Sequence, residues 1–114
     1  MVIEDDQDIR EIIGLLLDEA DYEVKLYPDV RSFRRDILWN EPNLLIMDVR
    51  LPDGNGHDLC REVKTDERTR KIPVLMMSAH ASGADVTKKF VPDDFIAKPF
   101  NIDDFVSRVN AVAN

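Results

Sequence analysis

The sequence is poor in cysteine and has no long apolar stretch. Its single cysteine, Cys60, excludes an internal disulfide, so nothing indicates an oxidising compartment. No apolar run is long enough to span a membrane, and no basic segment followed by an apolar one precedes Val2. We therefore expect a soluble, cytoplasmic domain with no membrane association.

Positive charge is also scarce, with 15 Lys and Arg residues against 23 Asp and Glu and a formal net charge of -8. Because phosphate contacts need clustered Lys and Arg, this balance argues against a nucleic-acid-binding surface. Repeats, low-complexity tracts and interdomain linkers are absent as well. Residues 1–114 are therefore expected to form one domain, large enough to bury a core without disulfides.

Short apolar runs alternate along the chain with amphipathic segments. The clearest run, residues 44–48, ends in Asp48 and is typical of a strand buried on both faces. A second such run covers residues 73–78, with Pro73 tolerated at its first position. Shorter strands are expected at three further places: residues 1–3, 23–27 and 94–97.

Helical spacing of apolar residues separates these strands. Amphipathic helices are expected at residues 8–20, 28–41, around 59–63 and from Ile102 onward. The segment 81–92 has Gly83 near its start and β-branched residues inside, which predicts a short or irregular fourth helix. Five strands alternating with about five helices predict an α/β fold with a parallel sheet and helices on both faces.

Polar residues stand where four of the five predicted strands end. Glu4 and Asp5 follow the first strand and Asp48 ends the third, while Ser78 and Lys98 stand at the ends of the last two. Because the carboxyl ends of parallel strands meet at one edge, where open α/β sheets bind ligands, we expect these side chains to converge.

Such a set is suited to magnesium-dependent phosphoryl transfer. Three close carboxylates repel one another, and a hard divalent cation with oxygen ligands, such as Mg²⁺, removes that repulsion. Lys98 and Ser78 add a cation and a hydroxyl for an anion. Asp48 is then a candidate acceptor of a phosphoryl group as an aspartyl-phosphate.

Taken in order, these residues resemble a response-regulator receiver domain of two-component signalling over nearly the whole chain. The resemblance implies a flavodoxin-like fold with a five-stranded parallel sheet of order 2-1-3-4-5. The matching pieces are Glu4-Asp5-Asp6, Asp48 with Leu51-Pro52-Asp53-Gly54 and Gly56, Ser78-Ala79, and Lys98-Pro99-Phe100.

The resemblance also implies a role for each acidic residue. Asp48 would take a phosphoryl group from a phosphohistidine on a sensor histidine kinase or a histidine phosphotransfer protein. Asp5, Asp48 and the backbone carbonyl of Arg50 would bind Mg²⁺ directly, and Glu4 would assist through water.

The other matching residues would act around the phosphoryl group. Lys98 would contact its oxygens, and Ser78 would move to bond them. Phe95 matches the switch aromatic, which turns inward when that hydroxyl moves. Arg50 and His80 fall where the family tunes the lifetime of the phosphoryl group, and the family has a cis peptide before the proline that follows Lys98.

One segment departs from the family pattern. The stretch between Ser78 and Lys98 is shorter than usual, and Val91-Pro92 stands where Gly-Ala commonly precedes Asp-Asp-Phe. In the family, the fourth helix, fifth strand and last helix form the face that signals to an effector domain or a second copy. The output surface of this chain is therefore left open.

Simpler interpretations remain for single residues. The acids of residues 4–8 are also favoured at a helix N-terminus, and residues 53–56 alone form an ordinary turn that would shape the loop. Phe95 alone would be a core residue, and Cys60 is expected to be a small buried hydrophobe.

Two other function classes compete with a phosphorylatable switch. An aspartyl phosphatase of the haloacid-dehalogenase type would need a second Asp two positions after the nucleophile, where this chain has Arg50, so a turnover enzyme is not expected. A degenerate receiver that only binds proteins would lack an acid, the acceptor or the lysine, and all are present. The short first strand slightly favours a fragment of a larger regulator or hybrid kinase over a stand-alone receiver.

Overall fold

In the computed structural model, which describes residues 1–37, 42–78 and 92–113, one parallel sheet forms the centre of the molecule. Its order is β2-β1-β3-β6-β7, and every neighbouring pair is parallel. Counted along the chain, this is the predicted order 2-1-3-4-5, which is confirmed. The strands are β1 (Val2–Ile3), β2 (Leu26–Tyr27), β3 (Leu45–Asp48), β6 (Val74–Ser78) and β7 (Asp94–Ala97).

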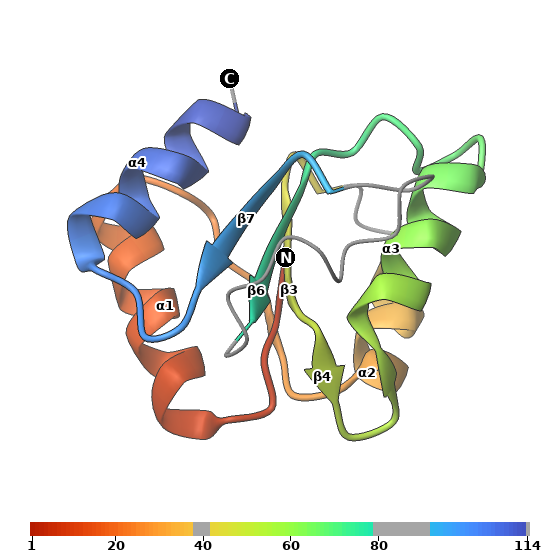
Figure 1. The fold of residues 1–114 in the computed structure, drawn as a ribbon, viewed down its shortest axis with the longest axis horizontal. Helices are drawn as coiled ribbons and strands as arrows, with labels where there is room; N and C mark the ends of the chain where they lie inside the picture. The colour runs from red at the N-terminus through yellow and green to blue at the C-terminus, as the bar shows by residue number, and fades with distance from the viewer. Residues whose placement is uncertain (38–41, 79–91, 114) are drawn as a thin grey trace.

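Helices cover both faces of this sheet, as predicted (Figure 1). α1 (Gln7–Glu19) and α4 (Ile102–Ala113) lie on one side, and α2 (Val30–Asp36) and α3 (Gly56–Thr65) lie on the other. Side chains of β3 alternate between the two cores, with Met47 in the cluster of α2 and α3 and Ile46 in that of α1 and α4. Because both faces are covered, β3 and β6 consist of buried residues from end to end.

The second strand is shorter than the sequence predicts. The expected strand at residues 23–27 is wrong at its start, because β2 covers only Leu26–Tyr27. Asp21 has a positive φ of 67°, and the N–H of Tyr22 still bonds to the carbonyl of Leu17 on α1. The following residues therefore belong to the connection from α1, and bonding to β1 begins only at the carbonyl of Lys25.

Two other regions differ from the predicted outline. The glycine-rich loop after Asp48 contains a small antiparallel hairpin, β4 (Arg50–Leu51) paired with β5 (Gly54–Asn55). The predicted helix at residues 81–92 lies outside the described residues except for Pro92, which is buried. The last part of the predicted helix 28–41 also lies outside them.

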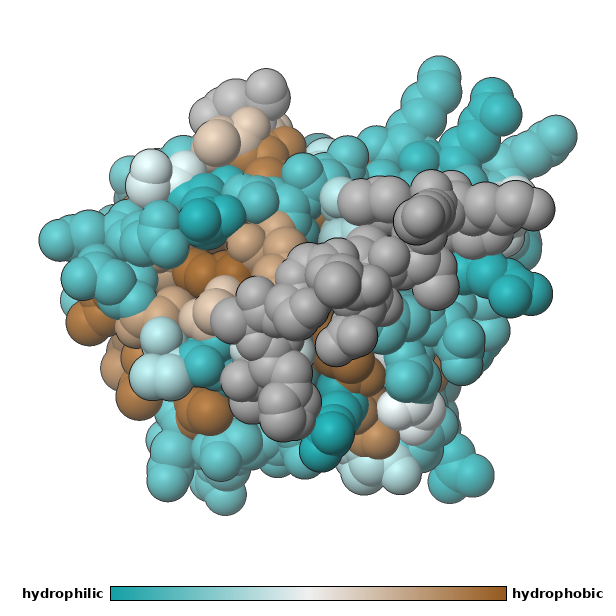
Figure 2. All heavy atoms as spheres, in the orientation of Figure 1, coloured by the Kyte–Doolittle hydropathy of each residue, from teal (hydrophilic) through white to brown (hydrophobic). Residues whose placement is uncertain are grey.

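Polar side chains cover much of the face in Figure 2, and hydrophobic ones gather on its left side, over α1 and α4. Large exposed hydrophobic side chains on those two helices are Ile12, Leu15 and Ile102. Within residues 1–37, 42–78 and 92–113, no helix is long and apolar enough to cross a membrane.

Candidate functional site

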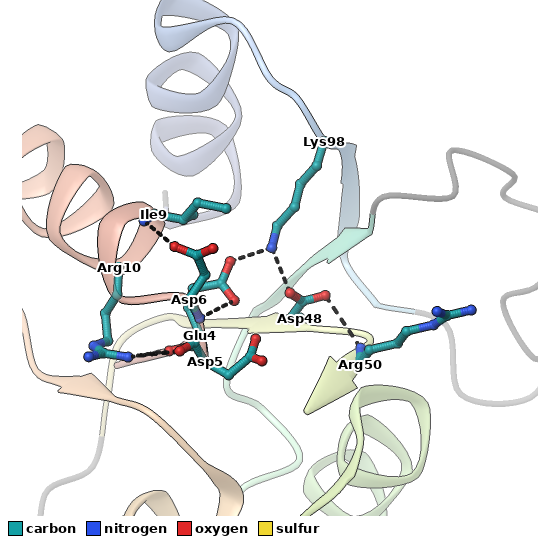
Figure 3. A network of polar contacts seen from close by, with 8 residues as sticks. All are labelled: Glu4, Asp5, Asp6, Ile9, Arg10, Asp48, Arg50 and Lys98. Carbon is teal, nitrogen blue, oxygen red and sulfur yellow. Dashed lines mark hydrogen bonds and ion pairs between the residues drawn. The ribbon is translucent and has the colours of Figure 1, made fainter. Parts of the chain in front are cut away.

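Three charged residues meet at the carboxyl ends of the strands (Figure 3). Glu4 follows β1, Asp48 ends β3 and Lys98 follows β7. The Nζ atom of Lys98 lies 2.6 Å from Oδ2 of Asp48 and also forms an ion pair with Oε1 of Glu4. Parallel pairing therefore brings together three residues that are far apart in the sequence.

A third carboxylate completes an acidic group at this edge of the sheet. Oxygen atoms of Glu4, Asp5 and Asp48 all lie within 4.8 Å of one another. Glu4 is fully buried and Asp48 nearly so, whereas Asp5 is exposed. Oxygen donors with one side open to solvent suit a hard cation that keeps part of its water shell, so this donor set fits Mg²⁺.

Burial and the lysine together set the protonation of the group. Burial raises the pKa of Glu4 to about 7; Lys98 opposes that rise and Asp48 adds to it. Burial would lower the pKa of Lys98, but its hydrogen bonds to Asp48 and Glu4 outweigh this effect and hold its pKa above the ordinary value. Lys98 is thus a permanent cation near neutral pH, and an additional cation would favour the ionised form of Glu4.

The acidic run at residues 4–8 has two roles. Asp6 is the N-cap of α1, where its Oδ1 accepts the N–H of Ile9 at 3.0 Å, and Asp8 lies in the first turn. The helix-capping interpretation therefore holds for these two residues. Glu4 and Asp5 instead form the acidic group with Asp48.

The loop after Asp48 is held close to the site by Gly56 and Asp53. The N–H of Gly56 donates to the carbonyl of Val49 at 2.7 Å, and a Cβ atom at position 56 would collide with the backbone oxygen of Asp48. Only glycine permits this approach. The carboxylate of Asp53 accepts the N–H groups of the first two residues of α2 at 2.8 and 3.0 Å. The turn therefore shapes the loop, as predicted, and its contact with α2 has no signal in the sequence.

Ser78 and Lys98 lie on neighbouring strands. Ser78 is buried at the end of β6, and its carbonyl accepts the backbone N–H of Lys98 at 2.8 Å. The Lys98–Pro99 peptide bond is cis, as the resemblance implied. The two residues named for phosphoryl contacts thus share one edge of the sheet.

The remaining predicted residues lie around this centre. Phe95 on β7 is partly buried against the cluster of α2 and α3. The N–H of Arg50 lies 3.4 Å from Oδ1 of Asp48, while its side chain points away from the acids (Figure 3). His80 lies outside the described residues, as do residues 81–91, which were expected to form the fourth helix of the output face, whereas β7 and α4 of that face are described.

Arg10 contacts this site, although the sequence motifs assigned it no role. Its Nη1 atom donates to the backbone carbonyls of Glu4 and Asp5. The available signal was a lone arginine two residues after the acidic run 4–8, and such an arginine is also common on ordinary helices. The contact could be identified only from the folded chain.

Comparisons with known proteins place these features in a family. Residues 1–110 match the model of the response regulator receiver domain. The transcriptional regulatory protein GltR of Pseudomonas aeruginosa is 32% identical over 114 residues, which are 98% of this chain and 47% of GltR. The chain thus spans about half the length of the curated relatives it matches.

Solved receiver domains have the same fold. One from a signal transduction histidine kinase of Syntrophus aciditrophicus has a TM-score of 0.89 and 29% identity, covering 98% of this chain and 86% of that one. The receiver domain of the sensor histidine kinase PA1611 from Pseudomonas aeruginosa, solved with a magnesium ion in its active-site cleft, has a TM-score of 0.82 and 22% identity, covering 98% and 94%. The family match, the sheet order and the strand-end acids agree, and this chain belongs to the response regulator receiver domains of two-component systems.

Proposed function

We propose that this domain accepts a phosphoryl group on Asp48 in a two-component phosphorelay. The observation that carries the proposal is the position of Lys98, whose ammonium contacts the Asp48 carboxylate beside two further carboxylates. Mg²⁺ would be bound by Asp5, Asp48 and the backbone carbonyl of Arg50, with Glu4 assisting. The magnesium ion in the PA1611 receiver domain supports this choice of metal.

The phosphoryl donor is a phosphohistidine on a sensor histidine kinase or a histidine phosphotransfer protein. A carboxylate oxygen of Asp48 attacks the phosphorus atom, so that an O–P bond forms as the N–P bond breaks. The electron pair of the broken bond stays on the imidazole, which takes up a proton. Bound Mg²⁺ supplies positive charge for the phosphoryl oxygens. Lys98 turns its ammonium from the carboxylate to those same oxygens.

The phosphoryl group then changes the surface of the domain. The Ser78 hydroxyl moves to donate a hydrogen bond to a phosphoryl oxygen, and Phe95 turns inward into the space this opens. The surface formed by the expected fourth helix, β7 and α4 is thereby presented differently to an effector domain or a second copy. Arg50 and His80 set how quickly water removes the phosphoryl group.

Intact mass after incubation with Mg²⁺ and acetyl phosphate tests this proposal. We expect the mass of one phosphoryl group on the wild-type chain and none on Asp48→Asn or in the presence of a chelator. Asp58→Asn is the matched control, because Asp58 is an exposed acid on α3. A chain that binds Mg²⁺ but neither gains the adduct nor releases phosphate would contradict the proposal and leave a protein-binding module.

A further inference from the structure

We propose that Arg10 is a positioning residue for the magnesium site. It holds the backbone between β1 and α1 so that the carboxylates of Glu4 and Asp5 meet that of Asp48. This inference rests on the proposed function, because it requires Mg²⁺ to bind at these three acids.

The contacts of Arg10 are directed at the acidic pair itself. Its Nη1 atom lies 2.9 Å from the carbonyl oxygen of Glu4 and 3.4 Å from that of Asp5. A carbonyl direction fixes the peptide plane that follows it, so one donor shared by two consecutive carbonyls restricts the backbone at both residues. The direction in which each side chain leaves the backbone is restricted with it.

Arg10 is itself anchored to the same short connection. Its backbone N–H donates to the carbonyl of Asp6 at 2.9 Å, and the side chain of Asp6 caps α1. The segment between β1 and α1 is therefore tied to the helix twice, once through Asp6 and once through the guanidinium. Figure 3 shows Arg10 and Lys98 on opposite sides of the acidic pair.

The choice of acceptor preserves the site for a cation. Arg10 bonds to carbonyl oxygens, so it does not occupy the carboxylate oxygens that a metal would need. Its positive charge nevertheless lies at the backbone of Glu4 and Asp5, two of the three acids of the group. An arginine paired directly with the Asp5 carboxylate would compete with Mg²⁺, whereas Arg10 holds the backbone of Glu4 and Asp5 and does not occupy their carboxylates.

A Mg²⁺ titration at constant ionic strength, followed by amide chemical shifts, tests the proposal. We expect Arg10→Gln to raise the Kd about tenfold, the lower end of the loss seen when a residue that orients metal ligands is removed. The Kd of Arg10→Lys for Mg²⁺ should lie between those of the wild-type chain and Arg10→Gln, because an ammonium keeps the charge but lacks the planar guanidinium donors. Arg61→Gln is the matched control, since it removes the same charge from an exposed position on α3.

Phosphorylation by acetyl phosphate separates positioning from general damage. At saturating Mg²⁺ the Arg10→Gln variant should reach the wild-type rate, with only its half-saturating Mg²⁺ concentration raised. If Arg10→Gln does not fold, Arg10→Lys decides, and a wild-type Kd in that variant overturns the proposal.

Failure of the proposal is distinguishable from failure of the proposed function. Equal Kd values for Arg10→Gln and Arg61→Gln overturn the role of Arg10, while phosphorylation of the wild-type chain would still support the receiver chemistry. A wild-type chain that binds no Mg²⁺ overturns both.

Discussion

Two lysines, Lys64 and Lys98, each join segments that are distant in the sequence, but their surroundings differ in charge. Lys64 on α3 donates to the carboxylate of Asp93 at 2.7 Å and to the carbonyl of Ile72 at 2.9 Å. The same Asp93 oxygen accepts the N–H of Val74 at 2.7 Å, at the start of β6. One positive charge meets one negative charge, and the contact ties α3 to the sheet.

Lys98 instead faces an excess of negative charge. Its ammonium contacts the carboxylates of Glu4 and Asp48, and the carboxylate of Asp5 lies close to both, so Lys98 pairs with only two of three close acids. Close acids without enough counter-charge must take up a proton or bind a cation. The pKa of Glu4 rises to about 7 mainly through burial, and Asp48 adds to that rise. The charges of Lys64 and Asp93 cancel, so that contact needs no ligand. The acids around Lys98 carry excess negative charge, which suits a bound cation.

The comparison is tested most strongly by removing each lysine. Lys98→Met should slow phosphoryl uptake by about 10²-fold, the loss expected when one donor to transferring oxygens is removed. Lys64→Met should leave the rate unchanged, since Lys64 serves only the fold. Time courses of intact mass with acetyl phosphate measure both. Equal rates for the two variants would show that the charge surplus at Lys98 has no catalytic meaning.

Magnesium should stabilise the chain only by binding at the acidic group of Glu4, Asp5 and Asp48. At a Mg²⁺ concentration of about twenty times the Kd, the free energy of unfolding should rise by about 1.8 kcal/mol. Asp5→Asn should abolish most of this gain, and Asp93→Asn should retain it. Urea unfolding at constant ionic strength provides the measurement. An equal gain in both variants would argue for unspecific ion binding.

Removing an acid should have opposite effects at the two lysines in the absence of metal. Asp93→Ala should lower the free energy of unfolding by about 1.5 kcal/mol, because the Val74 N–H and Lys64 lose their acceptor. Solvent weakens the Lys64–Asp93 contact, because the Asp93 side chain is 44% exposed. Asp48→Asn should instead raise stability, since it relieves the repulsion between the carboxylates of Asp48 and Glu4. If Asp93→Ala and Asp48→Asn both lowered the free energy of unfolding, the proposed difference between the Lys64 and Lys98 contacts would be wrong.

A third contact, between the Tyr27 hydroxyl and Asp36, extends the comparison to a hydroxyl that donates to a carboxylate. The hydroxyl donates to Asp36 at 2.9 Å, and burial followed by that hydrogen bond raises the pKa of Tyr27 to about 12. Between pH 10 and 12 the Tyr27 hydroxyl loses its proton in the unfolded chain but keeps it in the folded chain. A rise in pH over this range therefore lowers the free energy of unfolding.

Tyr27→Phe should therefore cost about 0.5–1 kcal/mol at pH 8, and this deficit should vanish soon after pH 10 and then reverse in sign as pH rises to about 12, because a shift of two pKa units outweighs it. Urea unfolding of both chains at a series of pH values checks the slope, with pH 8 as the reference. A constant deficit at every pH would show that Tyr27 titrates alike in both states.

Much of the fold could be predicted because its signals are local. The buried runs of β3 and β6 are continuous in the sequence, and their apolar character reflects helices on both faces. A parallel sheet then places the residues after its strands at one edge, so Glu4, Asp48 and Lys98 could be named before their contacts were seen. The limits of β2 could not, because they depend on how the chain leaves α1 at Asp21.

The sequence by itself thus determined the architecture, the family and the kinds of residue at the strand ends. Only the tertiary structure decided which acid of the run 4–8 caps α1, namely Asp6. It alone brought Arg10 onto the acidic pair, Asp53 onto α2 and Asp93 onto Lys64. The physical reason is that residue types and their spacing can be read from neighbouring positions in the sequence. Hydrogen bonds and charge balance instead depend on distances between segments that meet only after folding.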